Sequence, residues 1–133
     1  MEPVNQCANR RSPERLIVID PYPRTFQGIA AWSLSTGTPV QDTRTRFAQF
    51  VILGGIASEP SLRDNLVFKG GNALDFVLQP NRSTIDLDFS LDMTLGSELA
   101  DVDTLQTAVS TGLRRVALMS GCGLAIHSVR QNP

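Results

Sequence analysis

The chain has 133 residues, a length that favours one domain and is sufficient for a hydrophobic core. Its 41% hydrophobic and 19% charged residues are typical of a soluble globular protein, and its net charge of -1 gives no global reason to expect tight, nonspecific binding to nucleic acid. The N-terminus lacks the apolar run of a signal peptide, and no stretch is long and apolar enough to span a membrane. We therefore expect a cytoplasmic protein without membrane contact, in which Cys7 and Cys122 are reduced thiols.

Residues 1–41 are predicted to form an N-terminal extension. Residues 1–14 are polar and are expected to lack regular structure, whereas the apolar, mostly β-branched residues 16–19 predict a short strand. Thr25 is a candidate N-cap for a short helix that ends at the turn-rich residues 35–39. The apolar face expected for this helix comprises Phe26, Ile29 and Ala30.

Residues 42–133 are predicted to form the core domain, which begins with a long helix. Asp42 is its candidate N-cap, and Pro60 is expected to end it. Its apolar positions follow helical spacing and are Phe47, Phe50, Val51, Gly54 and Ala57. The Gly54-Gly55 pair weakens the helix but would allow another backbone to approach closely. Residues 61–65 are predicted to form a polar connection.

The central stretch predicts a strand, a turn, a helix and a second strand. Residues 66–68 are a short apolar run that Gly70 and Gly71 interrupt. The apolar stripe of the following helix consists of Ala73, Leu74, Val77 and Leu78. Residues 85–91 then alternate between apolar and polar side chains, which predicts a strand with one polar face.

The last part of the chain predicts one helix and one strand. Asp101 and Asp103 are both candidate N-caps for a helix over residues 101–119, and Gly121 and Gly123 both suit its C-terminal end. Residues 124–129 are read as a final strand.

Asp86 and Asp88 lie on the polar face of the second central strand, although Asp is disfavoured in strands. Their Cα atoms would lie roughly 6.6 Å apart, a spacing from which two carboxylates can share a hard cation. Mg²⁺ prefers one or two carboxylates together with phosphate oxygens. A solvated strand face explains the same pattern equally well.

The turn at residues 69–72, Lys-Gly-Gly-Asn, is a candidate phosphate site. It follows a strand and opens a helix, so its backbone N–H groups can converge on a phosphate. An ordinary strand-to-helix turn is the alternative. Arg82 and Thr84 could add a cation and a hydroxyl beside the acidic strand, and a surface ion pair or loop clamp is an equally common role for such an arginine. Together, these residues favour phosphoryl or nucleotidyl transfer.

These motifs resemble those of the AbiEii/AbiGii toxin family, within the DNA polymerase β-like nucleotidyltransferase superfamily. The family shows Lys-Gly-Gly-x-x-Leu and then Arg-x-Ser/Thr-x-Asp-x-Asp-Phe, which correspond here to KGGNAL at residues 69–74 and NRSTIDLDF at residues 81–89. The matching residues are Lys69, Gly70, Gly71, Leu74, Arg82, Thr84, Asp86, Asp88 and Phe89.

The resemblance implies an α/β fold, a small mixed sheet flanked by helices. It also implies Mg²⁺ bound at Asp86 and Asp88, and transfer of a nucleotide from an NTP to an acceptor such as tRNA or another RNA. The NTP would contact Lys69, Gly70, Gly71, Asn72 and Thr84, and Arg82 would assist catalysis. Family members are toxins of toxin–antitoxin or phage-defence systems, so a cognate antitoxin is the implied protein partner.

The chain departs from the superfamily pattern at its C-terminal end. The superfamily uses a third carboxylate on a later strand, and none of the later acidic residues of this chain matches it. Those residues are Asp92, Glu98, Asp101 and Asp103. We therefore expect that the C-terminal part of the domain is missing. A catalytically silent domain that binds nucleotide or a protein partner, and a structural fragment completed by another chain, remain alternatives.

Overall fold

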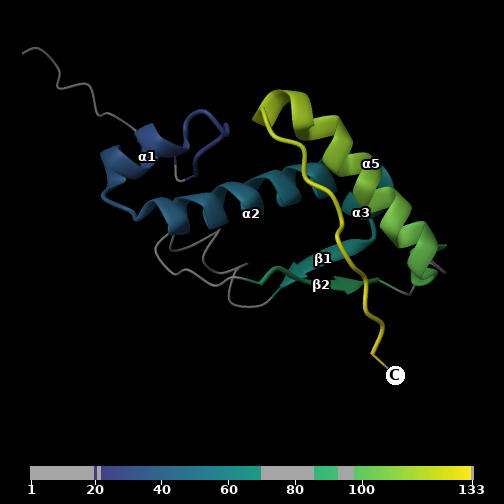
Figure 1. Cartoon of the computed structure of the whole chain (residues 1–133). Coiled ribbons are helices and arrows are strands. Elements are labelled where there is room, and N and C mark those ends of the chain that lie inside the picture. Colours follow the sequence, from purple (N-terminus) through teal and green to yellow (C-terminus); the bar gives the residue numbers. More distant parts are fainter. Residues whose placement is uncertain (1–19, 21, 70–85, 93–97, 133) are drawn as a thin grey trace, which may run out of the picture.

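The computed structural model describes residue 20 and residues 22–69, 86–92 and 98–132. Within them the elements are α1 (Ile29–Thr36), α2 (Val40–Ser58), α3 (Pro60–Arg63), β1 (Leu66–Lys69), β2 (Asp88–Leu91), the 3₁₀ helix η1 (Glu98–Ala100) and α5 (Val102–Ser120). The predicted fold class, helices with a small sheet, is confirmed (Figure 1). The predictions for residues 1–14, for the strand at 16–19 and for the helix that follows Gly71 lie outside the described residues.

Helix α1 differs from its prediction in its cap and in its buried face. Gly28 occupies the N-cap position, and the Thr25 hydroxyl accepts a hydrogen bond from the Gly28 N–H at 3.0 Å. Thr25 therefore shapes the turn before the helix and does not cap it. The buried side chains are Ile29 and Ser33, whereas Phe26 precedes the helix and is 53% exposed. The predicted end is confirmed, because Gly37 terminates α1 with a left-handed φ of 71°.

Helix α2 begins two residues before the predicted N-cap. Pro39 occupies the N-cap position and its carbonyl accepts a hydrogen bond from the Thr43 N–H, so Asp42 falls in the first turn. There its charge complements the helix dipole without capping the helix. Pro60 ends α2 as predicted, but it also opens α3. Within the polar connection predicted for residues 61–65, the short helix α3 extends to Arg63 and its Leu62 is 0% exposed, which the polar pattern did not predict.

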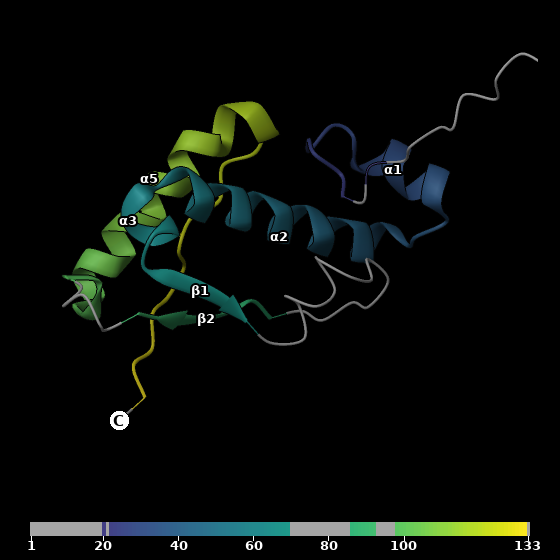
Figure 2. The same cartoon turned by 180° about the vertical axis from the view of Figure 1, so that it is seen from behind.

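Helices α2 and α5 cross where a glycine of each meets the other. A Cβ added to Gly112 would overlap the Gly55 carbonyl oxygen, and one added to Gly55 would lie 3.1 Å from the Gly112 carbonyl carbon. The close approach predicted for the Gly54-Gly55 pair is therefore confirmed at Gly55, whereas a Cβ on Gly54 would meet nothing within 4 Å. The crossing lies near the C-terminal end of α2 (Figures 1 and 2).

A buried cluster at the middle of α2 joins α1, α2, α5 and the segment that follows α5. Ile29 of α1 packs with Phe47 and Val51 of α2, and both α2 positions were predicted to be apolar core positions. Partly buried residues that complete this cluster are Val116, Cys122 and Leu124. The buried positions of α2 also include polar side chains, Thr43 and Gln49, which the apolar pattern did not predict.

Strands β1 and β2 form a two-stranded antiparallel sheet on one side of α2 (Figures 1 and 2). The register pairs Leu66 with Leu91 and Lys69 with Asp88. The rings of Phe68 and Phe89, which are also opposite each other, have centroids 5.2 Å apart. Both predicted central strands are therefore confirmed within the described residues, although β2 begins only at Asp88.

The predicted last strand at residues 124–129 is wrong. Asp101 caps α5 and Gly121 ends it in a left-handed conformation, as predicted, but the residues that follow belong to no strand of the described sheet. They run back past the helices toward the sheet side of the molecule (Figure 1). Cys122, Leu124 and Ile126 are half-buried and alternate with exposed residues. This alternation arises because one side of an extended segment packs on the helices, and such packing does not require a neighbouring strand.

Candidate active site

Asp86 and Asp88 lie at the N-terminal end of β2. Asp88 is the first residue of the strand and Asp86 precedes it by two residues. Both are exposed, whereas Leu87 and Phe89 are half-buried. Alternation along β2 places Asp88 on the exposed side of the strand, whereas Asp86 precedes the strand and lines a groove against α2 together with Leu87 and Phe89. Two exposed acidic residues thus lie two positions apart at the start of β2.

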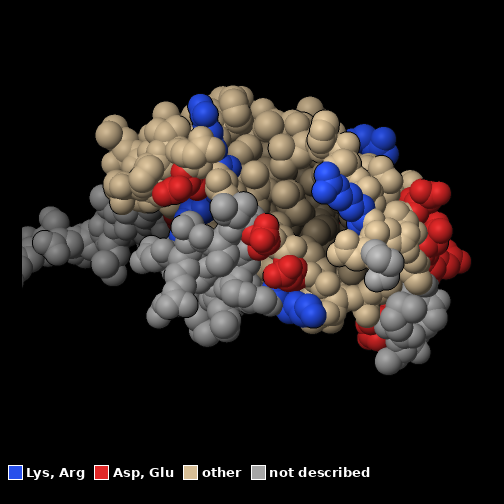
Figure 3. Space-filling model, turned by 60° about the horizontal axis from the view of Figure 1, so that its bottom comes forward, with Lys and Arg blue, Asp and Glu red and all other residues tan. Residues whose placement is uncertain are grey.

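Lys69 lies beside this acidic pair. It is the last residue of β1 and is directly opposite Asp88 in the antiparallel register. Directly paired residues project from the same face of a sheet, with Cβ atoms about 4.5–5.5 Å apart. Figure 3 shows acidic and basic side chains next to each other on the side of the molecule that carries the sheet. Lys69, which begins the predicted phosphate turn, is therefore adjacent to Asp88, one of the two predicted metal ligands.

The other predicted site residues are not placed by the structure. They are Gly70, Gly71, Asn72, Arg82 and Thr84, all of which lie outside the described residues. Their proposed contacts with nucleotide remain predictions from the sequence.

The donor set of Asp86 and Asp88 suits a hard divalent cation. Carboxylate oxygens are preferred by Mg²⁺, which keeps several positions for water and for phosphate oxygens of a substrate. Across residues 20, 22–69, 86–92 and 98–132, no group of three or more His, Cys, Asp or Glu side chains is arranged to hold a metal ion. Asp86 and Asp88 are therefore the candidate ligands that the described residues offer at the site.

A groove that the sequence did not predict adjoins Asp86. One wall is a face of α2 and the other is the start of β2, and the enclosed volume is about 490 Å³. We call this space the α2–β2 groove. The residues that line it are Thr45, Ala48, Gln49, Ile52, Asp86, Leu87 and Phe89. The signal available in the sequence was the pair Thr45 and Gln49, which places two polar residues one turn apart within an otherwise apolar helix face.

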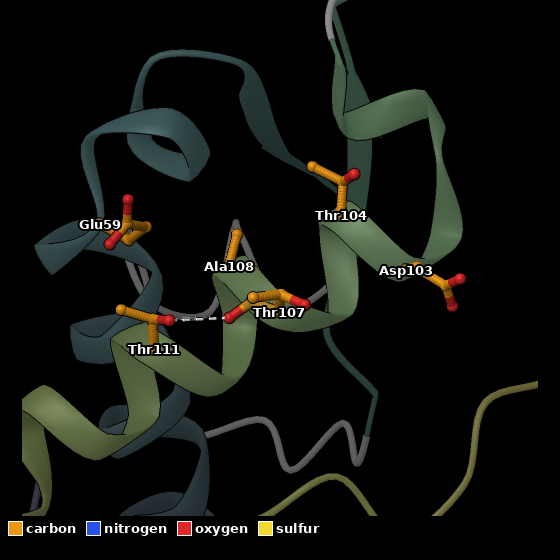
Figure 4. A pocket seen from close by; sticks show the side chains of 6 residues that line it. All are labelled: Glu59, Asp103, Thr104, Thr107, Ala108 and Thr111. Carbon is orange, nitrogen blue, oxygen red and sulfur yellow. Dashed lines mark hydrogen bonds between the residues drawn. The ribbon is translucent and has the colours of Figure 1, made fainter.

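A second pocket, of about 450 Å³, lies along α5 (Figure 4). Several of its polar groups are already used within the protein. The Thr111 hydroxyl donates to the Thr107 carbonyl at 2.9 Å, and the Thr104 hydroxyl donates to Asp101. Glu59 forms an ion pair with Arg115 at 3.3 Å, and Asp103 points away from Glu59 in Figure 4. This pocket therefore offers few groups for recognising a ligand.

In the part of the chain that the structure describes, no helix combines the length and the apolar character needed to cross a membrane.

Comparison with known families identifies the chain. The family model described as nucleotidyl transferase AbiEii toxin, Type IV TA system, matches residues 51–131, which is more than half of the chain. No curated protein matches the chain, and no solved structure does. The matched range includes both strands, Lys69 and the acidic pair Asp86 and Asp88. The chain therefore belongs to the AbiEii family of nucleotidyl transferase toxins of type IV toxin–antitoxin systems.

Proposed function

We propose that this protein is a Mg²⁺-dependent nucleotidyltransferase that transfers a nucleotide from an NTP to an RNA acceptor such as tRNA. The observation that carries this proposal is that two exposed carboxylates, Asp86 and Asp88, lie two residues apart at the start of β2, where Asp88 is directly opposite Lys69. The family supports the reaction class, and it supports a cognate antitoxin as the protein partner. A toxin that acts on RNA in this way would work in the cytoplasm.

Each residue has a distinct task in the proposed reaction. Asp86 and Asp88 would hold the cation, which when bound neutralises phosphate charge during transfer. Lys69 would attract the triphosphate and stabilise negative charge that develops on it. The other contacts are predicted from the sequence. Gly70, Gly71 and Asn72 in the turn, together with Thr84, would bind the nucleotide, and Arg82 would assist catalysis.

Transfer of labelled nucleotide from each NTP into an RNA mixture, with and without Mg²⁺, tests the proposal. The variant is Asp86→Asn/Asp88→Asn, and the control is Asp64→Asn/Asp103→Asn, which removes the same charge from exposed positions outside the site. We expect Mg²⁺-dependent transfer by the wild type and the control and a loss of at least about 10²-fold in the site variant. Equal transfer by the two double variants would refute the assignment.

Calorimetric titration of NTP and Mg²⁺ separates catalysis from the alternative of a catalytically silent domain. Heat of binding together with transfer supports the proposed enzyme. Binding without transfer into any RNA supports a domain that uses the same carboxylates only to hold nucleotide or to present a surface to a partner.

A further inference from the structure

The pattern of apolar residues does not by itself fix how β1 pairs with β2. Leu87, Phe89 and Leu91 recur at every second position and are half-buried. A shift of β1 by two residues along β2 would therefore still place apolar side chains on the same face, because side chains repeat every two residues along a strand. Residues 70–87 separate the two strands in the sequence, so the pairing is not imposed by a short hairpin loop. Another contact must select the observed register.

The rings of Phe68 and Phe89 make such a contact. The two residues are directly opposite each other, their ring centroids lie 5.2 Å apart, and the ring planes are inclined at 31°. The Asp92 N–H donates a hydrogen bond to the Asn65 carbonyl at 2.8 Å, and hydrogen-bonded pairs alternate with non-hydrogen-bonded pairs along antiparallel strands. By this alternation Phe68 and Phe89 form a non-hydrogen-bonded pair, in which side chains approach each other more closely. A shift by two residues would replace the ring pair with a contact between Phe68 and a leucine.

The charges on the other face do not hold the strands in this register. Lys69 is directly opposite Asp88, yet among the described residues no ion pair joins them. The position of Lys69 is therefore set by the backbone of β1 and not by its own charge. The ring pair that fixes this backbone against β2 lies one residue away on each strand.

We propose that Phe68 and Phe89 are positioning residues, which fix the register of β1 and β2 and thereby hold Lys69 opposite Asp88. In the alternative register, shifted by two residues toward the end of β2, Phe68 would be opposite Leu91 and Lys69 would be opposite Ser90. Lys69 would then lie roughly 6.6 Å along the strand from its place beside Asp88. The consequence for catalysis rests on the proposed nucleotidyltransferase function, whereas the choice of register does not depend on it.

Chemical cross-linking of the full chain tests the register directly, because Lys69 is the only lysine in the sequence. A carbodiimide joins a lysine amine to a nearby carboxylate as an amide, and mass spectrometry of the peptides identifies the aspartate. The test variant is Phe89→Leu/Leu91→Phe, which keeps the composition of β2 and moves the ring by two residues. The wild type should link Lys69 mainly to Asp88. The test variant should lower the ratio of Asp88 amide to Asp92 amide at least about tenfold.

Two controls separate the register from a general loss of packing. Phe50→Leu also removes an aromatic pair, since the Phe50 ring stacks on Tyr22 with centroids 6.1 Å apart, but this pair lies outside the sheet. Phe89→Tyr keeps the ring in the sheet. Both variants should show the wild-type ratio of amides. If the test variant does not fold by circular dichroism, Phe89→Leu alone provides the second test and should lower the ratio about threefold.

Transfer kinetics with labelled NTP test the positioning role. In the test variant kcat should fall together with the ratio of amides, and KM for NTP should change less, because Asp86 and Asp88 still hold the cation. Phe89→Tyr should retain the wild-type kcat. An unchanged ratio in the test variant and in Phe89→Leu would overturn the inference, and so would a changed ratio with an unchanged kcat. A wild type that transfers no nucleotide but shows the expected ratios would contradict the proposed function and support the assigned register.

Discussion

The exposed face of the sheet combines charges that act on one another and on any ligand. Lys69 and Asp88 are neighbours across the strands, so the lysine partly neutralises an acidic site that would otherwise repel a triphosphate. A cation bound by the aspartates and the lysine would together match the negative charge of an NTP. The register thus brings one proposed metal ligand, Asp88, next to the proposed phosphate ligand, Lys69.

Lys69 is expected to contribute through its charge. Lys69→Met should lower kcat/KM for nucleotide transfer by roughly 10²-fold, because one charged group that stabilises the phosphates is lost. Lys69→Arg should retain more activity than Lys69→Met, since it keeps the charge but changes its geometry. Steady-state kinetics with labelled NTP measures both. A Lys69→Met variant with wild-type kcat/KM would exclude a role for this side chain.

Asp101 links helix capping to pH. The hydrogen bond from the Thr104 hydroxyl, followed by the one from the Thr104 N–H, lowers the pKa of Asp101 below its ordinary value of 3.8. Because the pKa is lower in the folded state, the charged carboxylate stabilises the protein above the unfolded pKa. That contribution is lost as the pH falls through the folded pKa.

Asp101→Ala should therefore be less stable than the wild type at pH 7, and the difference should shrink as the solution is acidified below the ordinary pKa of the aspartate. Urea denaturation at a series of pH values measures the free energy of unfolding of both proteins. Asp103→Ala, in the first turn of the same helix, is the matched control. A difference between wild type and Asp101→Ala that does not change with pH would contradict this assignment.

At the scale of elements, α2 and α5 are held together by a close helix crossing and by polar contacts at one end of α2. The backbones meet at Gly55 and Gly112, and Leu113 packs beside them. Arg115 of α5 also donates a hydrogen bond to the Ser58 carbonyl at the C-terminal end of α2 and pairs with Glu59. Helix α2 is thereby fixed to α5 at one end, while its Thr45–Ile52 face lines the groove.

Gly112→Ala should destabilise the protein by about 1–3 kcal/mol, because its methyl group would collide with the Gly55 carbonyl oxygen and force the helices apart. The matched control is Gly54→Ala, where the methyl group meets nothing within 4 Å. That change should be neutral or stabilising by up to about 1 kcal/mol, since Ala favours helix more than Gly does. Chemical denaturation compares the two free energies of unfolding. Similar effects of the two substitutions would show that the helix crossing tolerates a side chain.

At the scale of the molecule, the sequence predicted features whose causes are local. Pro60 at the end of α2, the turn-rich residues 35–39 that end α1, and Gly121 at the end of α5 each act within a few residues, and each was identified. Asp101 was one of two candidate caps for α5. The alternation around Asp86 and Asp88 likewise predicted which side chains are exposed. The family resemblance, carried by residues 69–74 and 81–89, was confirmed by the match over residues 51–131.

Features that depend on distant partners were missed. Residues 61–65 look polar, but the single apolar side chain of Leu62 is buried completely when α3 packs against its neighbours. The alternation after Gly121 resembles a strand, yet Cys122 and Leu124 pack against the cluster of Ile29, Phe47 and Val51. The α2–β2 groove could not be predicted either, because it forms only when α2 lies against β2. The division of the chain at residue 41 stays a prediction.

Binding of Mn²⁺, a paramagnetic ion that shares the oxygen-rich octahedral preference of Mg²⁺, tests most directly whether Asp86 and Asp88 form the metal site. Electron paramagnetic resonance would measure free Mn²⁺ during titration of the full chain in the presence of NTP. We predict that Asp86→Asn/Asp88→Asn weakens Mn²⁺ binding at least about tenfold, whereas Asp64→Asn/Asp103→Asn binds like the wild type. Equal Mn²⁺ affinity in the wild type and both double variants would contradict the assignment of the metal site to these two aspartates.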